Sequence, residues 1–199
     1  MFRSLPPATR ALILINVGVF LLQLVAPDLL GNLFALWPAH TPLFRPWQLL
    51  TYGFLHDTHG FAHILFNMFA LFMFGPPLER YWGPRRMTFF YLVCVLAAGL
   101  TQLAVQRSAY PVEPTVGASG GIFGVLLAFA WYFPRQKLFV IPIPVPIPAW
   151  LLVTVYGFLE LFLGVTGREQ NVAHFAHLGG MLGGALCILY WRARRRFPG

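Results

Sequence analysis

The chain has 199 residues, of which 58% are hydrophobic and only 10% are charged. A soluble domain usually carries about 25% charged residues, so this composition excludes an ordinary soluble fold and predicts an all-α, polytopic membrane protein. The net charge of +8 would suit a nucleic-acid binder, but the basic residues stand in short loops and near the termini, where topology signals stand. We therefore expect the lipid bilayer, and no nucleic acid, as a partner.

Six apolar stretches predict six membrane-spanning helices that form a single domain over residues 1–199. They run approximately over residues 11–26, 61–78, 87–105, 119–133, 149–165 and 173–190. No small-residue cleavage site follows the first stretch, so we expect it to be retained and not removed as a signal peptide.

Two segments between the spans have distinct compositions. A long loop follows the first span, and its Trp37, Trp47 and Tyr52 side chains suit the membrane interface. Residues 141–148 alternate isoleucine or valine with proline. Alternate prolines remove the backbone donors that a helix needs, so this segment is predicted to be an extended connector that leads into the fifth span.

The distribution of the 14 Lys and Arg residues predicts the orientation of the bundle. With a cytoplasmic N-terminus, eleven of them fall on the cytoplasmic side, namely Arg3, Arg10, Arg80, Arg85, Arg86, Arg135, Lys137, Arg192, Arg194, Arg195 and Arg196. Three fall outside, namely Arg45, Arg107 and Arg168. This bias predicts that both termini are cytoplasmic and that the long loop is outside. The short, basic chain fits a bacterial plasma membrane better than an organelle.

The fourth span is too short for the bilayer. Residues 119–133 are about 15 residues, or about 22 Å at 1.5 Å per residue, whereas the hydrocarbon core is about 30 Å thick. The segment 108–118 must therefore dip into the membrane to meet the helix. Irregular backbone is tolerated at that depth only inside protein or beside water, so we expect an outward-open cavity with Ser119 at its floor.

Four polar residues fall at one predicted depth. His63 and Asn67 lie near the outer end of the second span, Ser119 begins the fourth, and His177 lies near the outer end of the sixth. Because these three spans all enter from outside, the four side chains share the outer layer of the membrane. A glycine-flanked serine with a histidine able to reach it is the arrangement that serine nucleophile chemistry requires.

Each of these residues has an expected role. His177 is the candidate general base, since neutral imidazole accepts a proton near pH 7. His63 and Asn67 are four residues apart and share a helix face, so they are candidate oxyanion donors together with the Ser119 backbone N–H at a helix N-terminus. Small-xxx-small pairs of glycines on the fourth and sixth spans would allow the close approach that brings the dyad together: Gly117/Gly121, Gly120/Gly124, Gly179/Gly183 and Gly180/Gly184.

Three elements in this order resemble the rhomboid intramembrane serine proteases. They are His63–Asn67 (HILFN), Gly117–Gly120 (GASG) and Ala176–Gly180 (AHLGG), and the outer segments Trp47–Tyr52 and Phe54–His56 also resemble that family's outer loop. The resemblance implies a six-helix rhomboid-like bundle and a Ser–His dyad without a carboxylate, formed by Ser119 and His177. It also implies an oxyanion site at His63 and Asn67, and a membrane-anchored, single-span protein substrate cut in or near its transmembrane segment.

Two positions depart from the family pattern. Some members carry a tyrosine four residues after the serine, against which the catalytic histidine packs, and here that position is Phe123. A phenyl ring can still stack on imidazole, so we expect activity to survive. The family's loop often reads Trp-Arg, whereas this chain has Trp47-Gln48, which affects loop anchoring and not chemistry.

Other titratable residues allow alternative interpretations. His174 competes with His177 as the base, although His177 precedes the glycine surface. Glu160 lies within the fifth span, where an acid is a functional hypothesis by default; it completes a triad, relays protons or makes a structural hydrogen bond, of which we favour the last. His56 and His59, with His63, suggest a metal, but no His-Glu-x-x-His pattern is present. We expect neither a metal nor another cofactor.

Three functions compete on this sequence. The leading one is an intramembrane serine endopeptidase that works through an acyl-enzyme. A non-catalytic rhomboid-like protein that binds membrane clients is the alternative, although such relatives typically lack the serine or the histidine. A transporter would show paired half-repeats and broken helices, and the sequence shows no internal repeat.

Overall fold

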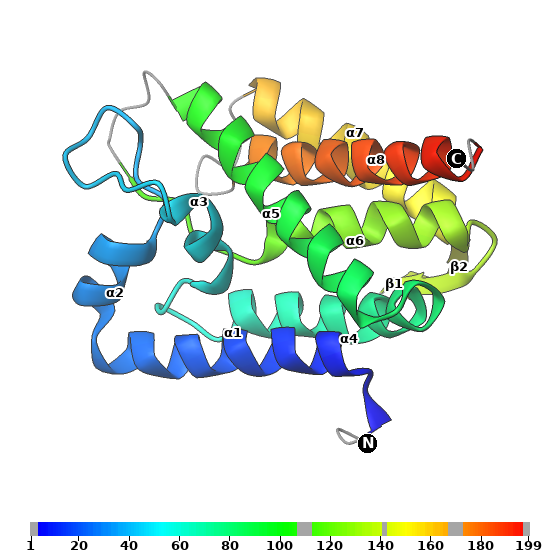
Figure 1. Ribbon diagram of the computed structural model, residues 1–199, viewed down its shortest axis with the longest axis horizontal. Coiled ribbons are helices and arrows are strands. Elements are labelled where there is room, and N and C mark those ends of the chain that lie inside the picture. The colour runs from blue at the N-terminus through cyan, green and yellow to red at the C-terminus, as the bar shows by residue number, and fades with distance from the viewer. Residues whose placement is uncertain (1–3, 107–112, 141–142, 167–172, 197–199) are drawn as a thin grey trace.

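The computed structural model describes residues 4–106, 113–140, 143–166 and 173–196 (Figure 1). Its elements are α1 (Pro7–Val25), α2 (Pro27–Phe34), α3 (Gln48–Thr51), the 3-10 helix η2 (Tyr52–Phe54), α4 (Ala62–Trp82), α5 (Pro84–Val105), α6 (Ser119–Tyr132), β1 (Lys137–Val140), β2 (Ile143–Pro148), α7 (Ala149–Thr166) and α8 (His174–Arg196). The predicted spans coincide with α1, α4, α5, α6, α7 and α8 in turn. The mostly helical fold is therefore as predicted.

Three described helices are long and apolar enough to cross a membrane: α1, α5 and α7. The helix α6 is apolar but shorter, with 14 residues. The helices α4 and α8 are not in this group. The count of six spans thus stays a prediction, as do the sides assigned to all the basic residues; Arg3, Arg107 and Arg168 also lie outside the described residues.

The core of the bundle lies where α8 packs against α5 and α6 (Figure 1). Glycines explain this close packing. On α8, Gly179 and Gly183 face α5, Gly180 faces α6, and Gly184 contacts both helices. A methyl group built on Gly184 would lie 3.3 Å from the Cα of Gly124 in α6, so the two backbones are almost in contact. The glycines that the sequence marked on α8 therefore allow close packing against both α5 and α6.

The other helices enclose this core from two sides. In Figure 1, α1 and α4 lie along one side and α7 lies beside α8 on the other. The helix α7 buries only Ala149, Val153 and Glu160. It is therefore the least embedded of the long helices.

Glu79 fixes the start of α1 against α4. Its carboxylate accepts hydrogen bonds from the backbone N–H groups of Ala8 and Thr9 and from the Thr9 hydroxyl, all at 2.7 Å. The first N–H groups of a helix have no partner within it, and a carboxylate also suits the positive end of the helix dipole. Glu79 is only 2% exposed, and its hydrogen-bond partners, Ala8 and Thr9, both belong to α1.

Gln48 anchors the outer segment that joins α1 to α4. Its buried side-chain oxygen accepts from the backbone N–H of Arg45 at 3.1 Å and of Trp37 at 3.4 Å. Its amide nitrogen donates to the Leu43 carbonyl at 3.0 Å. A glutamine at this position therefore holds the loop from within, through backbone groups.

Tyr52 corrects one expectation about this segment. The sequence suggested an interfacial ring, but Tyr52 is 1% exposed and its hydroxyl donates to the Val95 carbonyl of α5 at 2.9 Å. Trp47, in contrast, is 49% exposed. A tyrosine can be buried when its ring packs among apolar groups and its hydroxyl finds a hydrogen-bond acceptor. The sequence pattern alone does not reveal that such an acceptor is present.

The proline-alternating segment forms the second strand of a hairpin. Strands β1 and β2 are antiparallel, with Lys137 opposite Pro148 and Leu138 opposite Ile147. N–H groups point alternately to the two edges of a strand, so alternate prolines remove donors from one edge only. The extended conformation was predicted for this segment, and the pairing with β1 was not; Ile141 and Pro142 lie outside the described residues.

Candidate active site

Ser119 and His177 meet at the ends of two packed helices. Ser119 is the first residue of α6, and His177 lies in the first turn of α8. The Ser119 Oγ and the His177 Nε2 are 2.7 Å apart, which is hydrogen-bond distance. His177 is buried and Ser119 is half-buried. The structure thus brings together the two residues that the sequence selected as nucleophile and base.

Phe123 holds the imidazole of His177 from one face. The two rings are stacked, with centroids 4.3 Å apart and planes only 9° from parallel. Phe123 lies four residues after Ser119, so both side chains leave the same face of α6. Tyr156 in α7 makes a T-shaped contact with the same phenyl ring, at 6.3 Å between centroids.

Gly117 shapes the backbone just before the nucleophile. Its φ of +133° is a conformation that residues with a Cβ rarely adopt. A methyl group built there would lie 3.0 Å from the His63 Nε2 and 3.6 Å from the Ser119 Oγ. The glycine therefore leaves open the small space between His63 and the serine. The first turn of α6 has no side-chain cap.

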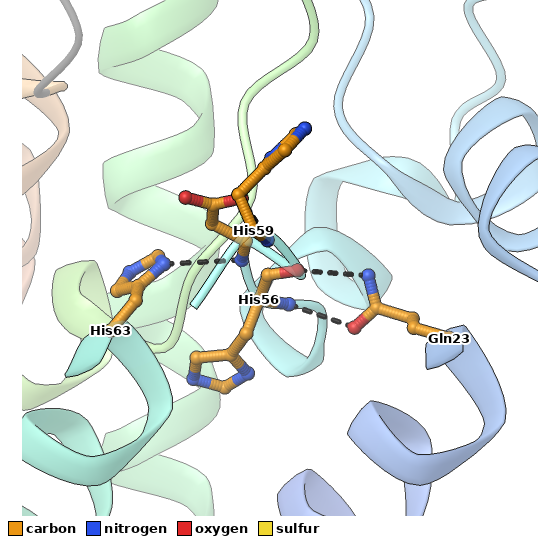
Figure 2. Close-up of polar contacts among 5 residues, drawn as sticks. Gln23, His56, His59 and His63 are labelled. Carbon is orange, nitrogen blue, oxygen red and sulfur yellow. Dashed lines mark hydrogen bonds and ion pairs between the residues drawn. The ribbon is translucent and has the colours of Figure 1, made fainter. Parts of the chain in front are cut away.

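The hydrogen bonds of His63 assign its tautomer. The backbone N–H of Asp57 donates to the His63 Nδ1 at 3.2 Å, as Figure 2 shows. An Nδ1 that accepts leaves the proton of a neutral imidazole on Nε2. That Nε2–H is the atom beside Gly117, so His63 has a donor on the side of Ser119.

The side chain of Asn67 makes a hydrogen bond within its own helix, α4. Its side-chain amide donates to the backbone carbonyl of His63 at 2.9 Å, one turn earlier in α4. The side chain is buried, and no contact between it and Ser119 is described. A role in oxyanion binding would have to use its second amide hydrogen, and it stays a prediction.

Glu160 contacts both histidines of α8. Its Oε2 lies 2.7 Å from the His174 Nδ1, in hydrogen-bond geometry, and 2.9 Å from the His177 Nδ1. The second contact has ion-pair distance, but the N–H direction is not that of a hydrogen bond. The sequence left the role of Glu160 open. Its contact with the candidate base depends on how α7 is rotated against α8, and sequence spacing carries no signal for that.

His56, His59 and His63 do not form a compact metal site. His59 is exposed and its Nδ1 lies 2.7 Å from an Asp57 oxygen, while His56 is 1% exposed and its ring meets the His63 ring edge-on at 5.1 Å. In Figure 2, His59 extends away from His56 and His63. Burial, and to a lesser extent the nearby His63, lower the pKa of His56 to about 4.

Comparisons with known proteins agree with this geometry. Residues 43–194 match the profile of the rhomboid domain. The rhomboid protease GluP of Bacillus subtilis is 33% identical over 140 residues, which are 69% of this chain and 24% of that protein. Rhomboid protein 1, mitochondrial, of Saccharomyces cerevisiae is 34% identical over 132 residues, which are 63% of this chain and 37% of that protein.

A third relative matches along nearly the whole chain. The rhomboid protease GlpG of Photorhabdus laumondii is 26% identical over 200 residues, which are 98% of this chain and 64% of that protein. The matches to these three relatives thus span from about a quarter to just under two thirds of their length. The domain match covers most of the sequence, including Ser119 and His177, and it confirms the resemblance: the chain belongs to the rhomboid family.

Proposed function

We propose that the protein is an intramembrane serine endopeptidase that cleaves membrane-anchored proteins in or near their transmembrane segments. The observation that carries the proposal is the 2.7 Å contact between the Ser119 Oγ and the His177 Nε2. The names of the relatives, which include rhomboid proteases, support the same activity. A client-binding protein without catalysis would have no need of this contact.

In the first half of the reaction, His177 takes the proton of the Ser119 hydroxyl on its Nε2 as the Oγ bonds to the scissile carbonyl carbon. The carbonyl oxygen becomes an oxyanion. When this tetrahedral intermediate collapses, the C–N bond breaks and the imidazolium returns the proton to the leaving amine. The products are a released peptide amine and an acyl-enzyme ester on Ser119.

In the second half, water replaces the amine. His177 takes a proton from the water as the water oxygen attacks the ester carbonyl. The imidazolium then protonates the Ser119 Oγ as the ester C–O bond breaks. The second product leaves as a carboxylic acid. The predicted outward-open cavity above Ser119 would supply this water. Part of the segment that would border it, residues 107–112, lies outside the described residues.

The oxyanion needs donors that are already in place. The His63 Nε2–H and the Ser119 backbone N–H are the best supported candidates, and Asn67 is a third. Removal of one such donor typically lowers kcat about 100- to 1,000-fold. Phe123 keeps the imidazole plane fixed throughout, since its ring lies parallel to that of His177.

We further propose a single six-span domain, with both termini in the cytoplasm of a bacterial cell and the site near the outer face of the plasma membrane. Single-span membrane proteins are the expected substrates. No cofactor or metal takes part in this mechanism.

The experiment that tests the activity combines a probe with a substrate. The purified protein in detergent should be labelled by a fluorophosphonate, and in liposomes it should cleave a single-span reporter. Ser119→Ala should abolish both, and His177→Ala should abolish cleavage, whereas His40→Ala, at an exposed histidine, should leave both unchanged. Equal labelling of the wild type and Ser119→Ala would exclude Ser119 as the nucleophile.

A further inference from the structure

Glu160 is the only polar residue among those that α7 buries. An acid within a membrane helix is costly unless it is paired, and this one is paired only with His174 and His177 in the part of the chain that the structure describes. The carboxylate and both imidazoles are buried. The pairing therefore explains how an acid is accommodated here, and it also connects α7 to the candidate base.

The two nitrogens of His177 have different partners. The Nε2 contacts the Ser119 Oγ at 2.7 Å, and the Nδ1 contacts the Glu160 Oε2 at 2.9 Å. A carboxylate beside Nδ1 favours the tautomer that carries its proton there. The Nε2 lone pair then faces the serine hydroxyl, as a general base requires. His174 donates to the same carboxylate oxygen and so holds the carboxylate in place.

The distances fit hydrogen bonding better than a shared metal ion. Glu160, His174 and His177 are close enough together to be considered as ligands. Ligands about 2.0 Å from a tetrahedral zinc lie about 3.3 Å from one another. The observed contacts of 2.7 and 2.9 Å are shorter than this, and the 2.7 Å contact with His174 is a hydrogen bond.

We propose that Glu160 is a positioning residue for His177, so that the dyad works as a Ser–His–Glu unit with His174 as the support of the carboxylate. This inference rests on the proposed function. It differs from the dyad without a carboxylate that the family resemblance implies.

The test compares Glu160→Gln, Glu160→Asp and Glu79→Gln with the wild type. Glu160→Gln should lower kcat about 100-fold with KM nearly unchanged, compared with the roughly 10⁴-fold that loss of an orienting aspartate costs a serine protease. Glu160→Asp should recover part of this loss. Glu79→Gln also removes a buried carboxylate, but on α4 and away from the site, so it should lower Tm and leave kcat of the folded protein unchanged.

A spectroscopic readout separates orientation from stability. In protein with ¹⁵N-labelled histidine, the wild type should show His177 as the Nδ1–H tautomer, and Glu160→Gln should show a mixture. Wild-type kcat in Glu160→Gln would overturn the proposal, provided that Ser119→Ala is inactive. If the wild type itself is inactive, the proposed function fails instead. Loss of activity with EDTA and recovery with Zn²⁺ would also overturn the proposal, in favour of a metal site.

A second inference rests on the opposite end of the bundle, where α1 begins and α8 ends (Figure 1). A cavity of about 770 Å³ lies there between α4, α5, α6 and α8. Three arginines line it, Arg86, Arg192 and Arg194, and the rest of its wall consists of tryptophan and tyrosine rings. We call it the arginine cavity.

Each of the three guanidinium groups lies over an aromatic ring. Arg86 lies 5.9 Å from the ring centre of Trp191, Arg192 lies 5.8 Å from that of Trp131, and Arg194 lies 5.0 Å from that of Tyr190. Such contacts use the face of the guanidinium group. Its N–H groups, five in each arginine, stay available in the plane.

The positive charge of the arginine cavity has no described counter-charge. Within the described ranges, none of the three arginines forms an ion pair with a carboxylate. Glu79, the acid in α4 at this end, directs its carboxylate to the start of α1. Three uncompensated charges and interfacial aromatic rings fit a phosphate group at the membrane surface.

We propose that the arginine cavity binds the phosphate of an anionic phospholipid headgroup. The test is native mass spectrometry of the protein in detergent with dioctanoyl phosphatidylglycerol, dioctanoyl phosphatidylcholine or glycerol 3-phosphate. Phosphatidylglycerol should bind at least tenfold more tightly than the other two, and Arg86→Gln with Arg192→Gln should remove this preference. Arg45→Gln, at an exposed arginine of the outer segment, should not. Equal binding of both lipids would overturn the proposal, and equal binding of glycerol 3-phosphate would identify the ligand as a soluble phosphate instead.

Discussion

Phe123 shows how one ring can replace another beside the base. The parallel stack on His177 uses the face of the phenyl ring and needs no hydroxyl. A well-formed aromatic pair contributes about 0.5–1.5 kcal/mol beyond burial. We therefore expect Phe123→Tyr to keep kcat within about threefold of the wild type and Phe123→Ala to lower it roughly tenfold.

Kinetic assays with a peptide or single-span reporter would check this expectation. Phe66→Ala is the matched control, because Phe66 is 71% exposed on α4 and its loss should not change kcat. A Phe123→Ala enzyme with wild-type kcat would show that the stack is not needed for the orientation of His177.

At the residue scale, the sequence predicted the pair Ser119 and His177, but it did not predict that Glu160 contacts His177. Ser119 and His177 could be found because glycines surround the serine and follow the histidine, and because the predicted spans place them at one depth. The contact of Glu160 with His177 could not, since it depends on the rotation of α7. The preference for His177 over His174 agrees with the geometry, as His174 faces Glu160 and not the serine.

At the scale of the helices, Gly180 limits how closely α6 and α8 can pack. A Cβ at this position would overlap the backbone carbonyl of Gly120, and a backbone cannot move aside as a flexible side chain can. Gly180→Ala should therefore separate the two helices. Overpacking of this kind costs about 1–3 kcal/mol, and it should also lengthen the contact between Ser119 and His177.

Thermal unfolding and probe labelling would measure the two effects of Gly180→Ala. We expect a lower Tm and at least tenfold slower labelling of Ser119. Gly18→Ala is the matched control, because no atom lies within 4 Å of a methyl group built at Gly18 in α1, and it should leave the labelling rate unchanged. Normal labelling of Gly180→Ala would show that the site tolerates a wider helix separation.

Helix extents followed well from apolar length, but the pairing of elements did not. The hairpin of β1 and β2 shows why. Alternate prolines predict extended backbone wherever they occur. Strand pairing, however, depends on which other segment reaches the edge of β2 that keeps its N–H groups. Likewise, the tie between Glu79 and α1 joins residues 70 apart in the sequence, and no local pattern announces it.

At the scale of the whole molecule, the junction of α1 with the outer segment should make stability depend on pH. The Gln23 amide in α1 bonds both backbone groups of His56, at 2.9 and 3.0 Å (Figure 2). His56 is buried beside this tie, and its pKa is about 4 in the folded protein, against an ordinary value of 6.5. Between about pH 4 and pH 6.5, the imidazole of His56 is therefore protonated in the unfolded chain and neutral in the folded protein.

The free energy of unfolding should consequently fall as the pH falls from about 6.5 to 4, by up to about 3 kcal/mol at 1.4 kcal/mol per pKa unit. Unfolding in detergent from pH 8 to pH 4 would measure it. His56→Gln, which does not titrate, should flatten this part of the curve. Asp57→Asn should leave this slope unchanged, because hydrogen bonds from His59 lower the pKa of Asp57 and its carboxyl group therefore titrates below this pH range. An unchanged slope in His56→Gln would assign the acid sensitivity to another group.

The helix α7 is weakly embedded in the bundle and yet contacts the candidate active site. It buries three residues, and one of them is the carboxylate that both histidines of α8 share. Any movement of α7 away from α8 therefore withdraws that carboxylate from His174 and His177 at the same time. If substrates enter beside α7, His177 would regain its orientation only after α7 has returned to α8. Cleavage by the proposed protease would then have to wait until the helix has closed behind the substrate.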